Sequence, residues 1–143
     1  MDNVFSIQIC ILSDVLNQTL QNDVIKGVYQ RSHFKHGQLD SLVVKRFAEN
    51  NGLSLGRAIA MRDKSVTKGS FQRSASQAEN VIAKSVGTLV LALSLGLVDY
   101  DVADSLVRVA KVVEASRATS ISDQEAHDLL LLVDGIIRKS SHG

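Results

Sequence analysis

The sequence predicts an all-α fold, and three observations support this. Proline is absent from all 143 residues, whereas average usage would supply roughly seven, so a sandwich or barrel full of tight turns is disfavoured. Apolar residues recur at intervals of three and four over most of the chain. Only one short stretch alternates like a strand, and no second strand is present to pair with it. We therefore expect three short helices in the middle of the chain, followed by a long apolar helix and two amphipathic helices.

Length and composition favour one compact domain inside the cell. A chain of 143 residues, 45% apolar, is long enough to bury a core without disulfides or metal. A single cysteine excludes a disulfide framework and favours the cytoplasm. The longest uncharged stretch, 85–98, is shorter than the ~20 residues that span a bilayer. The N-terminus lacks the basic residues and the cleavage site of a signal peptide. We expect a cytoplasmic protein with no membrane contact.

The N-terminal segment, 1–35, has two interpretations. Ile7, Ile9 and Ile11 alternate with polar residues, as in a strand. With a period of 3.6, apolar residues instead form one helical stripe: Phe5, Ile9, Leu12, Leu16 and Leu20. We favour the helix, because the strand has no partner.

Residues 39–83 predict three helices separated by breaks of three to five residues. The first has an apolar face and ends at Gly52, a left-handed cap; its face comprises Leu39, Leu42, Val43, Phe47 and Ala48. Ser54 caps a second helix over 55–62, whose inward residues are Ala58, Ile59 and Met61. Thr67 caps the third. Such an order, with a basic and polar third helix, is typical of a helix-turn-helix unit.

The C-terminal part predicts a dimerisation region. A helix over about 70–95 ends at Gly96, and its second half is apolar nearly all round, so we expect it at the centre of the core or of a subunit interface. Amphipathic helices follow over 101–116 and 122–139, the latter starting with a Ser122–Glu125 capping box. The apolar surface of 85–139 exceeds what one small domain needs, which predicts a homodimer. The chain thus divides into an N-terminal helical segment (1–35), a helix-turn-helix region (36–84) and a helical core and dimerisation region (85–143), together one compact domain.

Positive charge is concentrated in the middle of the chain. Residues 26–84 hold eleven Lys and Arg against four acids, a net of +7, whereas 1–25 and 85–143 each carry −3. This distribution suggests a polyanionic partner for the middle region. The alternative is that helical faces differ in charge by chance.

A resemblance to a known family reinforces the DNA interpretation. Gly52-Leu53-Ser54, Ile59-Ala60 and the run Val66–Arg73 resemble the helix-turn-helix of sigma-factor C-terminal domains and of small archaeal plasmid and viral regulators. This resemblance implies a transcriptional regulator that reads double-stranded DNA. The chain departs from the family pattern in the turn, where Asp63, Lys64 and Ser65 replace the usual leucine and glycine, and the spacing from Ala60 to Thr67 is one residue longer than usual. These departures affect the packing angle of the second helix and thereby the orientation of the third.

A recognition helix enters the major groove with its N-terminal end, so side chains near its start meet bases and phosphates. Arg reads guanine, Gln reads adenine, and Lys, Ser and Thr mostly hold phosphate. Phe71 stands where the family has an apolar core residue, so the resemblance implies that it packs inward onto Ile59 and Val43 rather than stacking on a base. Each polar residue has an alternative role as solvated surface. The candidate DNA-binding residues are Thr67, Lys68, Ser70, Gln72, Arg73, Ser74 and Gln77, with Arg57, Arg62 and Lys64 as phosphate contacts.

Other functions find less support in the sequence. No nucleophile triad, phosphate-binding loop or metalloprotease motif occurs, so we expect no enzyme and no cofactor. His33 and His36 have no further ligands placed to complete a metal site and are expected at the surface. The alternative function is a helical interaction or assembly protein whose basic middle binds an acidic protein or RNA. An enzyme whose site only the fold assembles is a third possibility.

Overall fold

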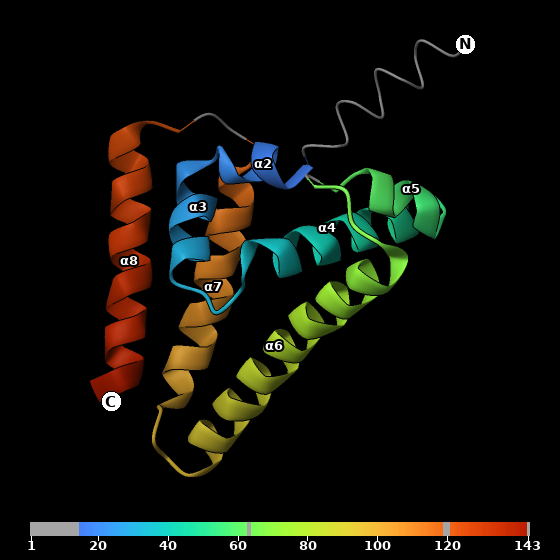
Figure 1. The fold of residues 1–143 in the computed structure, drawn as a ribbon. Coiled ribbons are helices and arrows are strands. Elements are labelled where there is room, and N and C mark those ends of the chain that lie inside the picture. Colours follow the sequence, from blue (N-terminus) through green and yellow to red (C-terminus); the bar gives the residue numbers. More distant parts are fainter. Residues whose placement is uncertain (1–14, 63, 119–120, 143) are drawn as a thin grey trace. The chain divides into compact units, whose positions relative to one another are not determined.

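The computed structural model describes residues 15–62, 64–118 and 121–142, and every regular element in this part of the chain is an α-helix (Figure 1). This confirms the all-α prediction. The helices are α2 (Val15–Leu20), α3 (Asp23–Gln30), α4 (His36–Asn50), α5 (Leu55–Ala60), α6 (Lys68–Ser94), α7 (Tyr100–Ser116) and α8 (Asp123–His142). Of the stripe expected near the N-terminus, Leu16 is buried in α2. Phe5, Ile9 and Leu12 lie outside the described residues.

The chain divides into two compact units. Unit 1 comprises Met1–Leu20 and His33–Ala83, and unit 2 comprises Gln21–Ser32 and Lys84–Gly143. Helix α2 packs on α4 in unit 1, whereas α3 packs on α7 and α8 in unit 2. Residues 15–35, the described part of the segment 1–35, therefore contribute to both units.

The core of unit 1 forms where α4, α5 and the start of α6 meet. Val44, Ala48, Ala58, Met61 and Phe71 make up its buried cluster. The inward residues predicted for α5 are found there, with Ile59 at the edge. For α4, the predicted set of inward-facing residues was partly wrong.

Leu42 and Ala48 are buried, but Leu39, Val43 and Phe47 are only half-buried, and Val44 is fully buried instead. Helix α4 turns a different face inward because Asp40 and Ser41 are also buried, 2% and 0% exposed. Their partner is Arg62, a cation at the start of the link after α5.

Two of the predicted helix ends have the expected glycine caps. Gly52 has a φ of +65°, and the Leu53 and Gly52 amides donate to the carbonyls of Ala48 (2.8 Å) and Glu49 (3.3 Å). Gly96 has a φ of +70° and ends α6 in the same way. Only a residue without a Cβ adopts this conformation at low cost, so these glycines fix where α4 and α6 stop.

Unit 2 is built around α3. The Asn22 side chain caps this helix by accepting from the amides of Val24 (3.0 Å) and Ile25 (3.2 Å). Gly27 allows close approach to α8, since a Cβ there would lie 2.5 Å from Leu130 Cδ2. The Arg31 guanidinium donates to both carboxylate oxygens of Asp134, at 2.5 and 2.8 Å. These contacts join α3 to the C-terminal helix.

The second half of α6 does not lie in a core. Val86 and Val90 on this segment are 56% and 57% exposed. The first alternative from the sequence, the centre of the core, is therefore wrong for the described chain, because α3, α7 and α8 pack on one another instead. The second alternative, a subunit interface, stays a prediction. None of the described helices combines the length and apolarity needed to cross a bilayer.

Candidate nucleic-acid interface

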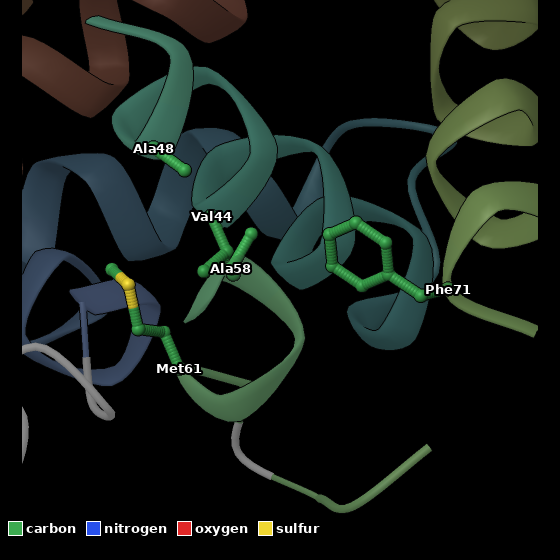
Figure 2. Close-up of a cluster of buried hydrophobic side chains, with 5 residues drawn as sticks. All are labelled: Val44, Ala48, Ala58, Met61 and Phe71. Atoms are coloured by element: carbon green, nitrogen blue, oxygen red, sulfur yellow. The ribbon is translucent and has the colours of Figure 1, made fainter. Parts of the chain in front are cut away.

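Phe71 anchors the start of α6 to the core of unit 1. Its ring points between α4 and α5, towards Val44 and Ala58 (Figure 2), and the residue is 1% exposed. The sequence predicted this inward orientation correctly. Ile59 borders the cluster as expected, and Val44 takes the place expected for Val43. Burying a Phe side chain stabilises the packed state by about 1.5–3 kcal/mol, so the ring holds the first turns of α6 against the other helices.

Helix α6 has opposite buried and exposed faces over its first three turns. Phe71, Ala75 and Ala78 are buried at spacings of four and three, whereas Gln72, Arg73 and Gln77 are exposed. Thr67 caps the helix, since its hydroxyl accepts from the Ser70 amide at 3.1 Å. The sequence predicted this cap. The outer face of the helix is therefore polar and is backed by a packed apolar face.

Most of the candidate DNA-binding residues lie at the surface of unit 1. The exposed ones are Arg57, Lys64, Thr67, Lys68, Gln72, Arg73 and Gln77, and the half-buried ones are Ser70 and Ser74. Gln77 Oε1 accepts from Gln38 Nε2 of α4 at 3.3 Å. The structure thus gathers most of the expected residues on or next to the start of α6, with Arg57 on α5.

Arg62 does not belong to this exposed set. Its side chain is only 9% exposed, and its Nε lies 3.5 Å from Asp40 Oδ2. Its Nη1 donates to Ser41 Oγ at 2.7 Å and to the Gly37 carbonyl. The expected phosphate contact is replaced by an internal ion pair, because Asp40 is itself buried and requires a compensating charge.

A second ion-pair group, which the sequence did not predict, neutralises part of α4. Glu79 Oε1 of α6 lies 3.0 Å from Lys45 Nζ and 3.8 Å from Arg46 Nη2. The hydrogen bond from Lys45, with a smaller effect of Arg46, lowers the pKa of Glu79, so the carboxylate is ionised near neutral pH. The residues lie 33 and 34 positions apart in the sequence, and no local pattern indicates such a pair. One of the two positive charges on this side of α4 is therefore balanced within unit 1.

The connection between α5 and α6 is longer than in a helix-turn-helix. Residues 61–67 separate Ala60 from Lys68, whereas the motif uses a turn of three to four residues. The structure shows three consecutive helices around one core, with a longer link before the third.

Clustered metal ligands or a hollow lined by polar groups would indicate a catalytic or metal site among the described residues. No group of three or more His, Cys, Asp or Glu side chains comes together among them. A hollow of about 260 Å³ on unit 1 is lined by Lys45, Leu55, Phe71, Gln72, Ala75 and Ser76. Its one charged side chain, Lys45, is paired with Glu79. This hollow holds no pair of groups arranged for acid–base or nucleophilic chemistry.

Comparisons with known proteins add no further identification. No family model, no curated protein and no solved structure matches the chain.

Proposed function

We propose that the protein binds double-stranded DNA sequence-specifically and acts as a transcriptional regulator, with the first three turns of α6 in the major groove. One observation carries the proposal. Gln72, Arg73 and Gln77 are exposed on the outer face of these turns, while Phe71 on the opposite face is locked into the core. A groove-reading helix needs this combination of a rigid back and a polar front.

The exposed side chains suit base and phosphate contacts. Arg73 has the fork of donors that pairs with guanine, and Gln72 has the donor and acceptor that pair with adenine. Lys68 is the first residue of α6 and Lys64 lies just before the helix. Both would meet phosphates as the helix enters the groove. The amides of the first helical turn favour the same anion.

Internal ion pairs engage three other cations of unit 1. Lys45 and Arg46 share Glu79, and Arg62 is paired with Asp40. By contrast, no ion pair of Lys64, Lys68 or Arg73 is found among the described residues. These three cations surround the start of α6 and are the strongest candidates for phosphate or base contact.

Fluorescence anisotropy with duplex DNA over a salt series tests the proposal. Binding should weaken steeply with salt, with a log–log slope of roughly −4 to −8 for a dimer that neutralises several phosphates. Lys68→Ala should make the slope shallower by roughly one for each phosphate that Lys68 neutralises, and Arg73→Ala should weaken binding or relax sequence preference. Arg108→Ala removes an exposed cation from unit 2 and serves as the matched control. DNA binding that is absent at low salt, or is weakened equally by all three substitutions, would refute the proposal.

The proposal includes a homodimer. Two copies related by a two-fold axis would present two recognition helices to a palindromic site, which doubles the base readout. A chain that stays monomeric at tens of micromolar would contradict this part of the proposal.

A further inference from the structure

Exposed apolar side chains are concentrated in unit 2. Of the large hydrophobic residues of the described chain that are exposed, Ile82 alone belongs to unit 1 and twelve belong to unit 2. The distribution of buried hydrophobic residues is the reverse, with nine in unit 1 and four in unit 2. These four are Val24, Val98, Val102 and Ala126. Unit 2 therefore leaves most of its apolar surface uncovered within one chain.

Nine of the twelve exposed residues lie on the second half of α6, on α7 and on the link between them, named here the α6–α7 hairpin; within the described part of one chain α7 packs on α3 and α8 and not on α6. The five residues 95–99 join these helices (Figure 1), and Gly96 in this link has a φ of +70°. The nine are Val86, Val90, Leu91, Leu95, Leu97, Tyr100, Leu106, Val107 and Val112. Val86 and Val90 are four residues apart on α6, and Ala103, Leu106, Val107 and Ala110 follow the helical spacing of three and four on α7, so each helix presents an apolar stripe.

The size of this surface is that of an interface. A Val or Leu side chain carries roughly 60–120 Å² of apolar surface. The nine residues are 36–71% exposed, which leaves roughly 300–600 Å² of apolar area uncovered on the hairpin. A stable pair of proteins buries about 800 Å² per partner, of which somewhat more than half is apolar. The total is of the order of the apolar area on one side of a standard interface; it is spread over more than one face of each helix, and Val86, Val90, Leu106 and Val107 supply the part assigned to the partner.

The chemistry of the hairpin favours a second copy as the partner. Residues 85–98, the end of α6 and most of the link to α7, contain no charged residue, so they offer no charge pattern for selecting an acidic or basic partner. Two identical apolar stripes complement each other without any such pattern. Two helical hairpins joined face to face form a four-helix bundle, a common way of covering four amphipathic helices.

We infer that two copies of the chain pair through their α6–α7 hairpins, forming a four-helix bundle between subunits that covers Val86 and Val90 of α6 and Leu106 and Val107 of α7. The pairing forms without DNA. It deepens the homodimer of the proposed function by naming the surface, and its test is separate from that of DNA binding.

Light scattering of the 143-residue chain at tens of micromolar tests the pairing. The chain has a mass of 15.5 kDa, and the wild type should have twice that mass. Val90→Asp and Val107→Asp should each give the monomer mass, because each places a charge on the covered surface. Leu131→Asp makes the same change on α8, at a residue that is 55% exposed, and should leave the dimer intact.

Far-UV circular dichroism checks that the variants keep their helices, which is expected because Val90 and Val107 are more than half exposed in the single chain.

A second measurement on the wild type requires no variant. The unfolding temperature of a dimer rises with protein concentration, and we expect that rise here. A wild-type mass other than twice 15.5 kDa, or an unfolding temperature independent of concentration, would overturn the inference. If Leu131→Asp gave a monomer and Val90→Asp remained a dimer, the assignment of the interface to the hairpin would be overturned. A wild-type dimer that fails to bind DNA would refute the proposed function and leave the pairing in place.

Discussion

Arg62→Met removes the charge of a buried ion pair while keeping most of the side chain's length. In the native chain the Arg62 Nε lies 3.5 Å from Asp40 Oδ2, and the two side chains are 9% and 3% exposed. The same guanidinium holds Ser41 and the Gly37 carbonyl of α4. The pair therefore ties the link after α5 to the first half of α4.

The substitution should lower the free energy of unfolding by about 3–5 kcal/mol. This magnitude is the usual cost of removing one partner of a buried pair, because Asp40 stays buried and loses the opposite charge of Arg62. Asp40→Asn in the Arg62→Met background removes the remaining buried charge. It should therefore recover much of the loss, although the single substitution Asp40→Asn is itself destabilising.

Urea denaturation followed by circular dichroism measures the four chains of this cycle. A loss below about 1 kcal/mol for Arg62→Met, or no recovery in the double variant, would refute the reasoning that the pair is buried and coupled. The same variant separates stability from DNA contact. With its guanidinium inside unit 1, Arg62→Met should leave the salt dependence of DNA binding unchanged, and a shallower slope would contradict the internal placement of Arg62.

Two further predictions concern unit 2. Gly27→Val should lower the free energy of unfolding by about 1–3 kcal/mol through overpacking. Even a Cβ at this position would lie 2.5 and 2.6 Å from the methyl carbons of Leu130. Leu130→Ala in the same chain should recover part of the loss, and urea denaturation measures the stability of both variants. The hydrogen bond from Arg31 lowers the pKa of Asp134 below its ordinary value of 3.8. The folded state thus binds this proton less readily than the unfolded state, so the contribution of the pair is complete above about pH 4 and is lost as the pH falls through the lowered pKa. Acid denaturation should therefore destabilise the wild type more than Asp134→Asn, and equal acid sensitivity would contradict the assignment.

Local chemistry explains the parts of the fold that the sequence predicts well. The glycine caps at Gly52 and Gly96 and the hydroxyl caps at Ser54 and Thr67 depend on residues within a few positions of each helix end. The inward position of Phe71 was implied by the resemblance, which places an apolar core residue there, and the structure puts Phe71 on one helical face with Ala75 and Ala78. All of these features were visible without knowledge of the tertiary structure.

Features that depend on long-range contacts were not visible. Asp40 and Ser41 are polar residues on a face of α4 that hydrophobicity alone assigns to solvent, and only the approach of Arg62 buries them. The link of Glu79 to Lys45 and Arg46 likewise joins two helices that are distant in sequence. For the second half of α6, the apolar sequence predicted a covered surface. It did not distinguish between covering by the same chain and covering by another chain.

The proposal that α6 reads DNA is tested most directly by mapping the interface residue by residue. Amide NMR spectra of the chain, recorded during titration with a duplex, report which residues change environment. We predict the largest shifts at Thr67–Gln77 and at Lys64, with small shifts on α8. Shifts concentrated on α7 and α8, with the start of α6 unchanged, would contradict the proposed interface.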